Sequence, residues 1–436
     1  MTNPETTSTI TIPIIGASIT GLTTAHSLLS HFTTPNNTTK NKGPKIKILL
    51  INPTPSFYWA IAAPRILTKP TAFTESQYLI PIADGFAKYS PDVFEFILGR
   101  ATSLDFENKV LNVEEVTDTE STKTLREIKY DYLVLASGST PSASSTETLF
   151  PGEDGEKEIY PFKLSPTSTT TITEAIKSAQ TTISSAKRIT VIGAGPIGVE
   201  IAGELGDLIT PSSPSSSSEG ESRKEITLIS STPRILPTLK PSASETATSL
   251  LTNKGVRVLT DRKVISVSSK EQGGYELKLN NGETLETDIY IPTIGVLPNS
   301  SYIPREVLDE RGWVRVDSEL KVEGVEGVYA AGDITTHTQK LSFKADEMAG
   351  VVVGNLVDDI GNINGVGKGG KGRGWWRCGG GGRKTYDEGN DVMMVVPVGT
   401  SGGTGQAFGW VLVSFMVWLA KGRDYFIWKA KGYVFK

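Results

Sequence analysis

Sulfur and imidazole side chains are scarce in this chain of 436 residues. It has one cysteine, Cys378, and three histidines, His26, His31 and His337. A single cysteine excludes a disulfide network, a paired-cysteine metal site and the redox dithiol that some reductases place beside their cofactor. Because few ligand residues of this kind are present, we predict that the protein binds no metal ion.

Targeting signals and strong net charge are also missing. The N-terminal residues 1–5 are polar and acidic, unlike a secretory or transit peptide, and Thr2 excludes N-myristoylation. We therefore expect a cytoplasmic protein. A net charge of −4 makes nucleic acid an unfavourable partner. The length and the 38% hydrophobic content predict two to three folded domains.

Two glycine-rich turns are the most informative features that are present. Residues 16–21 (GASITG) and 193–198 (GAGPIG) each follow a short apolar stretch and open a helical pattern. Such units hold the pyrophosphate of a dinucleotide against backbone N–H groups at a helix N-terminus. Two units in one chain predict one tightly held and one exchanging cofactor, as in a flavoprotein reductase.

The two turns are not equally complete. The second has Gly193, Gly195 and Gly198, which allow a tight bend, a close phosphate approach and close packing of helix on strand. In the first turn Ser18 replaces the middle glycine; its small side chain offers a hydroxyl to a phosphate oxygen. Either string alone also fits an ordinary turn.

Both units lack the acid that normally binds a ribose hydroxyl about 20 residues after the turn. Asn52 ends the first unit's second strand and still offers an amide oxygen to a hydroxyl. Ser230 ends the corresponding strand of the second unit, and Arg234 follows it. Since no carboxylate repels a 2′-phosphate there, we expect NADPH to be used at least as well as NADH. The alternative is that Arg234 is a solvated loop charge.

Three further strands end in small residues. Residues 131–138 and 288–295 place Gly138 and Gly295 where the chain crosses beside a cofactor, and residues 327–333 end at Asp333. A helical pattern follows from Leu341 to Leu356. Asp333 can hold a ribityl hydroxyl while that helix directs its N-terminus at a flavin ring, which stabilises the negative charge of the reduced form. A simple N-cap is the alternative role.

In this order the motifs resemble the pyridine nucleotide-disulfide oxidoreductase superfamily. Residues 57–65 (FYWAIAAPR) are similar to the apoptosis-inducing-factor-like flavoproteins, and within these the chain is most similar to the group of ferroptosis suppressor protein and its fungal relatives. The resemblance runs from about Ile10 to the C-terminus and includes residues 422–426. The resemblance is highly specific for the fold and for FAD as cofactor. It is much less specific for the electron acceptor.

The resemblance also implies roles for single residues. Arg65 would lie near the flavin, Ala101 near the adenine, and Lys340 near the ribityl chain and ring. Glu200 would stand between nicotinamide and flavin, with a solvated helix glutamate as the alternative. The predicted cofactor-binding residues are Gly16, Ala17, Ser18, Gly21, Asn52, Arg65, Ala101, Gly138, Asp333, Gly193, Gly195, Gly198, Arg234 and Gly295, and the predicted catalytic residues are Glu200 and Lys340.

These expectations define an α/β protein with two Rossmann-like dinucleotide-binding domains, the second inserted in the first, and a C-terminal α+β domain. The predicted limits are 1–165 and 296–360 for the FAD domain, 166–295 for the NAD(P)H domain, 361–390 for a glycine-rich basic loop and 391–436 for the C-terminal domain. Polar insertions at 33–44 and 211–218 fall between helix and second strand, away from both turns.

The C-terminal part contains two unusual segments. Residues 365–382 combine glycines with lysines, arginines and two tryptophans, which fits a flexible loop or a basic arm that contacts phosphates. Residues 407–419 are apolar but, at about 1.5 Å per residue, too short a helix to span a bilayer. They predict a packed helix or an interfacial one that contacts a membrane surface.

We therefore expect an FAD-dependent NAD(P)H oxidoreductase. With no cysteine pair beside the flavin, the electron acceptor must come from outside the chain. Apolar aromatic positions near the C-terminus and the family resemblance favour a quinone. A protein electron carrier is the first alternative, and a redox-controlled, apoptosis-related interaction protein with little turnover is the second. The sequence does not predict an oligomeric state.

Overall fold

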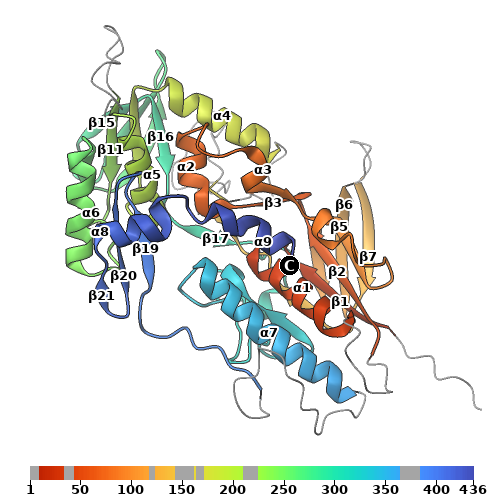
Figure 1. Ribbon diagram of the computed structural model, residues 1–436. Coiled ribbons are helices and arrows are strands. Elements are labelled where there is room, and N and C mark those ends of the chain that lie inside the picture. Colours follow the sequence, from red (N-terminus) through yellow and green to blue (C-terminus); the bar gives the residue numbers. More distant parts are fainter. Residues whose placement is uncertain are drawn as a thin grey trace, which may run out of the picture.

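The fold consists of two α/β units and a C-terminal part that packs on both (Figure 1). A computed structural model describes residues 9–33, 44–116, 123–142, 162–163, 171–209, 224–363 and 383–436. Cys378, the whole predicted glycine-rich segment 365–382 and most of the two polar insertions lie outside these ranges.

The first unit is built on a seven-stranded sheet with the order β18-β8-β1-β2-β5-β6-β7. Its strands are β1 (Ile10–Ile15), β2 (Ile46–Asn52), β5 (Phe94–Asp105), β6 (Val110–Val116), β7 (Lys123–Lys129), β8 (Leu133–Leu135) and β18 (Val328–Ala330). β1 is parallel to β2 and β8, with Ile12 opposite Ile48 and Ile14 opposite Val134. Helices α1 (Ile19–Thr33) and α7 (Ser342–Ile363) pack on each other against this sheet. Near-continuous apolar strands suit such a sheet, because helices or loops cover both of its faces.

The second unit repeats the plan with a four-stranded parallel sheet in the order β12-β11-β10-β16. Its elements are α4 (Ile172–Ser185), β10 (Arg188–Ile192), α5 (Pro196–Gly206), β11 (Glu225–Ile229), α6 (Pro241–Asn253), β12 (Arg257–Leu259) and β16 (Ile289–Pro292). An antiparallel sheet of β13 (Val264–Ser269), β14 (Tyr275–Leu279) and β15 (Thr284–Thr287) completes it. The α/β fold with two dinucleotide-type units is therefore confirmed.

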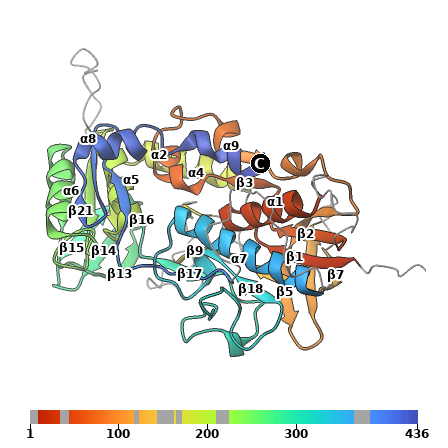
Figure 2. The same ribbon diagram turned by 60° about the horizontal axis from the view of Figure 1, so that its bottom comes forward.

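The chain crosses between the units through two short antiparallel strands, β9 (Ser139–Pro141) and β17 (Val296–Pro298). The first unit also extends toward the second through β3 (Ser56–Tyr58), α2 (Ala63–Thr68), α3 (Glu75–Tyr78) and β4 (Leu79–Pro81). Helix α2 packs on α4 and α5, so residues that precede the second unit by more than a hundred positions reach its nucleotide helix. Figure 2 shows the two units side by side.

The C-terminal part contains β19 (Met394–Pro397), β20 (Gly403–Ala407), β21 (Trp410–Val411), α8 (Ser414–Val417) and α9 (Ala430–Val434). The prediction of one helix over residues 407–419 holds only from Ser414 onward, in α8 and the π-helix Trp418–Gly422. The first part is wrong, because Ala407 pairs with Trp410 in a hairpin. Its two turn residues, Phe408 and Gly409, both have positive φ, 49° and 75°, which is the backbone of a tight hairpin turn. An unbroken apolar run has no periodicity that distinguishes this hairpin from a helix.

Helix α7 agrees better with its sequence pattern. It begins at Ser342, one residue after the predicted start, and continues to Ile363. Within the described ranges, no helix is both long and apolar enough to cross a membrane.

Candidate active site

The first glycine turn is shaped by contacts that leave no room for side chains. Gly16 has φ of 105°, and a Cβ there would lie 2.3 Å from the carbonyl oxygen of Ala136. A Cβ on Gly21 would lie 1.8 Å from the carbonyl oxygen of Gly16. Helix α1 starts at Ile19, within this glycine-rich segment, and has no acidic residue in its first turn. Its free N–H groups thus form an anion site without a competing negative charge.

Asn52 connects this turn to the end of β2. The amide oxygen of Asn52 accepts a 2.9 Å hydrogen bond from the backbone N–H of Ala17, and its amide nitrogen donates to the Thr54 carbonyl oxygen at 2.8 Å. The side chain is buried and therefore fixed in orientation. Since an amide oxygen has two lone pairs, one is left for a ribose hydroxyl, the role that the sequence predicts.

Asp333 follows β18 in a short 3₁₀ turn, Gly332–Ile334. Its carboxylate accepts hydrogen bonds from the hydroxyl of Ser139, at 3.0 Å, and from the ammonium of Lys163. Burial opposes ionisation of Asp333, but the charge and hydrogen bond of Lys163 and the bond from Ser139 outweigh it and hold its pKa below the usual value. Asp333 is therefore an anionic acceptor at neutral pH.

Lys340 is the cation next to this acid along the chain. Its ammonium donates to the carbonyl oxygen of Thr335 and stands 4.0 Å from the centre of the Trp313 ring, in a cation–π contact. Burial lowers the pKa of Lys340 to about 8, while the charge of Asp333 opposes that fall. Lys340 thus changes its charge in a pH range that is accessible to the enzyme.

The second glycine turn has the same construction. Gly193 has φ of 108°, and its Cβ would lie 2.7 Å from the carbonyl oxygen of Thr293. A Cβ on Gly198 would lie 1.8 Å from the carbonyl oxygen of Gly193, whereas one on Gly195 would meet open space. Gly195 is thus the position where a ligand can approach the backbone most closely. Gly295, with φ of 114°, also faces open space.

Glu200 lies one helical turn into α5 and is only 3% exposed. The ammonium of Lys421, from the C-terminal part, donates to its carboxylate at 2.5 Å. Burial raises the pKa of Glu200, and Lys421 opposes this rise. The alternative of a solvated glutamate is therefore incorrect for this position. The sequence gives no sign of the partner, because 221 residues separate the two.

Arg65 is placed differently from its predicted position at the flavin. It is 4% exposed and forms a buried ion pair with Glu204 of α5, where Nη2 and Oε1 are 2.8 Å apart. Its remaining donors bind the carbonyl oxygens of Gly422 and Arg423 at 2.7 and 2.8 Å. The guanidinium thus joins α2, α5 and the C-terminal part, and it is not among the described residues that line the cavity below.

Arg234 lies in the loop after β11. Its Nη2 donates to the carbonyl oxygen of Pro237 at 2.8 Å, and its Nη1 is buried without a hydrogen-bond partner among the described residues. Nearby, the hydroxyl groups of Ser230 and Thr232 are 2.9 Å apart. Arg234 is thus half-buried and held by the loop, with donor capacity left over.

A cavity of about 1340 Å³ brings many of these groups together. Predicted residues that line it are Gly16, Ala17, Ser18, Asn52, Ala101, Gly138, Asp333, Lys340 and Glu200. Predicted residues that do not line it are Gly21, Arg65, Gly193, Gly195, Gly198, Arg234 and Gly295. Lys163, Glu388 and Lys421 also line it, and no sequence motif identified them as site residues. One wall is apolar and comes from Phe343 and residues 392–395.

Two dinucleotide-type turns near one shared cavity define an oxidoreductase of the flavoprotein class. The chain belongs to the pyridine nucleotide-disulphide oxidoreductase family, whose sequence pattern matches residues 10–349. It is therefore an oxidoreductase that uses FAD and NAD(P)H.

Three curated relatives place the chain within that family. It is 39% identical to the oxidoreductase ptaL of Pestalotiopsis fici over 74% of this chain and 76% of that protein. It is 30% identical to the oxidoreductase phnG of Penicillium herquei over 98% of this chain and 96% of that one. Human ferroptosis suppressor protein 1 is 25% identical over 69% of this chain and 72% of its own length.

A solved structure supports the fold. The water-forming NADH oxidase of Lactobacillus brevis, bound to NADH, superposes with a TM-score of 0.61 over 80% of this chain and 69% of that one. The sequences are 19% identical, so the likeness concerns the fold alone.

Proposed function

We propose that the protein transfers electrons from NAD(P)H through FAD to a quinone. The observation that carries the proposal is the shared cavity, which extends from the first glycine turn to Glu200 on the second nucleotide helix and ends against an apolar wall. A donor, a cofactor and a flat apolar acceptor can thus meet in one cavity.

The residues of the first unit fit FAD. Gly16 and Gly21 form a cradle that any Cβ would fill, and α1 offers its N-terminus to a pyrophosphate. Asn52 and Asp333 present acceptors to ribose and ribityl hydroxyls. Bound FAD would supply the two-electron chemistry that side chains lack. Lys340 would place positive charge near the ring and favour its reduced, anionic form.

The second unit would hold the nicotinamide nucleotide. Gly195 leaves space for a phosphate at the start of α5. Glu200 of the same helix and Lys421 of the C-terminal part pair with each other and both line the cavity. The pair would orient the carboxamide end of the nucleotide by charge-assisted hydrogen bonds. The free donor of Arg234, together with the lack of an acid at Ser230, supports use of NADPH.

An acceptor from outside the chain is required because one cysteine cannot form a redox pair within it. The apolar wall at Phe343 and residues 392–395 suits a planar, weakly polar molecule better than a protein partner, which would need access from the surface. A quinone meets these conditions. The alternatives, reduction of a carrier protein and redox-controlled partner binding with little turnover, make different kinetic predictions.

Stopped-flow reduction by NADH and NADPH, followed by reoxidation with quinones, oxygen and cytochromes, tests the proposal. We expect NAD(P)H to bleach the flavin band within seconds and a quinone to restore it faster than the other acceptors. Absence of bleaching would refute the reductase. If the flavin is bleached quickly but only a carrier protein reoxidises it, the carrier protein and not a quinone is the electron acceptor.

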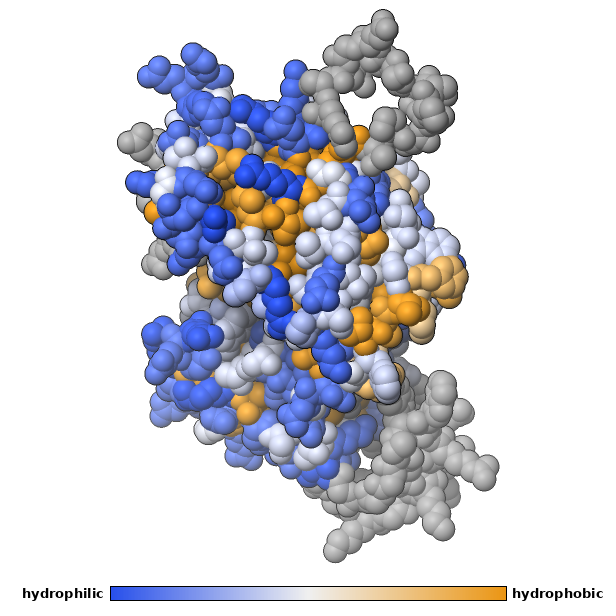
Figure 3. All heavy atoms as spheres, turned by 90° about the vertical axis from the view of Figure 1, so that its left-hand side faces the viewer, coloured by the Kyte–Doolittle hydropathy of each residue, from blue (hydrophilic) through white to orange (hydrophobic). Residues whose placement is uncertain are grey.

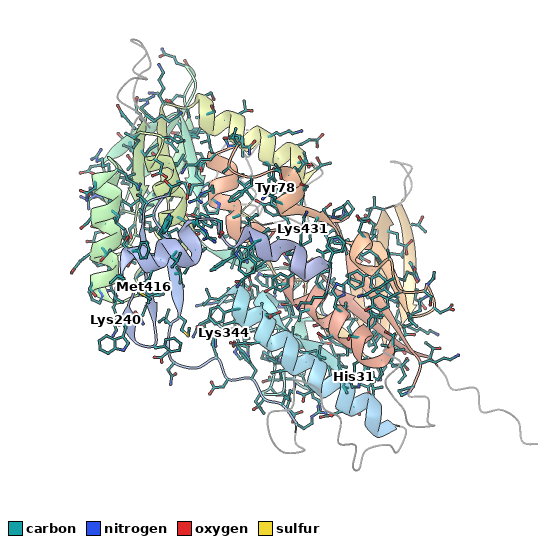
Figure 4. The ribbon with its side chains drawn as sticks, in the orientation of Figure 1. His31, Tyr78, Lys240, Lys344, Met416 and Lys431 are labelled. Atoms are coloured by element: carbon teal, nitrogen blue, oxygen red, sulfur yellow. The ribbon has the colours of Figure 1, made fainter. Side chains whose placement is uncertain are left out.

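We also propose that the C-terminal part contacts a membrane surface. Phe408 and Trp410 at the hairpin turn are 75% and 78% exposed, and Val413, Phe415, Met416 and Leu419 are more than half exposed. Figure 3 shows apolar residues gathered on the side of the molecule that contains this part. Lys240, labelled with Met416 in Figure 4, donates to the Gly409 carbonyl oxygen at the hairpin turn. Aromatic side chains beside a lysine suit an anionic lipid interface.

Sedimentation with phosphatidylcholine vesicles, with and without phosphatidylserine, tests this contact. We expect the protein to pellet with the anionic vesicles and the double variant Phe408→Ser/Trp410→Ser to remain in the supernatant. Leu125→Ser is the matched control, because Leu125 is 68% exposed on the distant strand β7. Equal behaviour of wild type and double variant would refute the contact.

A further inference from the structure

Glu388 is an acid in the cavity that the proposed function leaves without a role. It lines the cavity, and its side chain is 19% exposed. Its carboxylate accepts hydrogen bonds from the hydroxyl of Thr338, at 3.2 Å, and from the backbone N–H of Gln339. The loop that leads into α7 thus fixes the position of this carboxyl group. Glu388 itself lies beyond residue 349, where the match to the family ends.

His337 stands behind this carboxylate. Its Nδ1 lies 3.8 Å from Oε2 of Glu388, close enough for an ion pair but longer than a hydrogen bond. The imidazole packs edge-on against the Tyr386 ring, with centroids 4.8 Å apart. Nε2 of His337 and the hydroxyl of Tyr386 are buried with no partner among the described residues. The imidazole thus has Glu388 as its nearby acid–base partner.

Several charges act on this pair. Burial lowers the pKa of His337, Glu388 opposes the fall, and Lys340 adds to it. Lys344 lies 5.9 Å from the centre of the Tyr386 ring. Burial raises the pKa of Tyr386 to about 12, and the negative charges of Glu388, Glu347 and Asp387 add to the rise. Glu388 and His337 thus place a carboxyl group, with an imidazole behind it, in the wall of the cavity.

Glu388 lies between two parts of the cavity. Lys340, which follows the loop residues that bind Glu388, lines the cavity with Asp333 on the cofactor side. The apolar wall begins four residues after Glu388, at Val392. The carboxyl group therefore lies where the predicted flavin region gives way to the predicted acceptor region.

We infer that Glu388 donates a proton to the acceptor and that His337, behind it, positions the carboxyl group. The inference rests on the proposed function. Reduction of a quinone to a hydroquinone takes up two electrons and two protons. A hydride from the reduced cofactor accounts for both electrons and one proton, and one carbonyl oxygen must receive the second proton from an acid. Glu388 supplies it as its O–H bond breaks, and the carboxylate left behind regains a proton from solvent, which reaches its 19% exposed side chain.

Glu388→Gln tests the inference, because the amide keeps the size and some hydrogen bonding but has no acidic proton. Ferricyanide is the comparison acceptor, since it takes up electrons without protons. We expect reduction by NAD(P)H and turnover with ferricyanide to stay within about twofold of wild type, while quinone reoxidation slows about 100-fold, as for the loss of a general acid. Glu347→Gln, an exposed glutamate on α7, is the matched control and should change neither.

Proton NMR of the histidine ring gives a readout that does not depend on turnover. The chain has three histidines, so the ring signals can be assigned by single substitutions. The negative charge of Glu388 raises the pKa of His337. We therefore expect Glu388→Gln to lower the pKa of His337 and to leave the pKa values of His26 and His31 unchanged. Thermal unfolding and the flavin spectrum of the variant show whether it folds.

The outcomes separate this inference from the proposed function. If wild-type flavin is not bleached by NAD(P)H, the proposed function and this role both fail. If bleaching is normal and Glu388→Gln reoxidises with quinone as fast as wild type, only this inference fails. Equal slowing with quinone and ferricyanide, or an unchanged pKa of His337, also contradicts it, because either result assigns Glu388 a role other than proton transfer.

Discussion

Arg65 and Glu204 form a buried ion pair that ties the first unit to the helix of the second glycine turn. Arg65 Nε lies 3.1 Å from both carboxylate oxygens, and Nη2 lies 2.8 Å from Oε1. Lys69 and the hydroxyl of Tyr425 bind the same carboxylate at 2.7 and 3.2 Å. Because Arg65 also holds the carbonyl oxygens of Gly422 and Arg423, it fixes the backbone next to Lys421, the partner of Glu200.

Arg65→Ala should therefore lower the free energy of unfolding by about 3–5 kcal/mol, since it leaves a buried carboxylate without its main partner. Urea unfolding measures the change. Glu286→Gln, in an exposed pair with Arg188, should change the free energy of unfolding far less, because solvent screens that pair. The combined replacement Arg65→Met/Glu204→Leu should recover much of the loss. A cost for Arg65→Ala as small as that of the exposed control would contradict a structural role for the pair.

Gly16→Val should abolish FAD binding. A Cβ at this position lies 2.3 Å from the Ala136 carbonyl oxygen, and φ of 105° is unfavourable for any branched residue. The ratio of flavin to protein absorbance in purified samples measures occupancy. Gly350→Ala is the control, because Gly350 lies in α7 with open space around its Cβ position. A folded Gly16→Val protein with one FAD per chain would refute the cofactor site.

Arg234→Ala should weaken NADPH binding and leave NADH binding nearly unchanged. A charge-assisted hydrogen bond to the 2′-phosphate predicts a loss of about 1.5–3 kcal/mol, which is roughly 10- to 100-fold in Kd. Titration of flavin reduction with each nucleotide measures it. Arg257→Ala, an exposed arginine on β12, serves as the control. Equal losses of affinity for both nucleotides would show that Arg234 does not bind the 2′-phosphate and is a loop charge without a specific contact.

Lys340 should give the reductive half-reaction a pH dependence. Its pKa of about 8 means that the ammonium is present below that pH and lost above it. We expect the rate of flavin reduction to fall as the pH rises through about 8, because the cation that stabilises the reduced form disappears. Lys340→Arg, which stays charged, should shift this fall to higher pH, and Lys340→Ala should keep FAD but be slow throughout. The same pH profile in all three proteins would exclude Lys340 as its origin.

The glycine turns show how much of the site could be predicted from sequence. Gly16 and Gly193 are needed because the backbone at each has positive φ and passes close to a neighbouring carbonyl oxygen, and both conditions arise within one strand, turn and helix. The start of α7 is also predictable, because the helical pattern that begins at Leu341 is a local feature of the sequence. The apolar run at 407–419 is helical only from Ser414, since its first residues form a hairpin that the pairing of Ala407 with Trp410 defines and that apolar composition does not distinguish from a helix.

The two nucleotide-binding turns and the α/β class follow from local sequence, because steric limits on consecutive residues decide them. Which charges meet depends on the folded arrangement of distant segments. Arg65 and Glu204 are 139 residues apart, and Glu200 and Lys421 are 221 residues apart. Such partners are selected by burial, since a charge removed from water must find an opposite charge wherever the fold brings one near. That selection assigned Arg65 to the contact between the two units instead of the predicted flavin site.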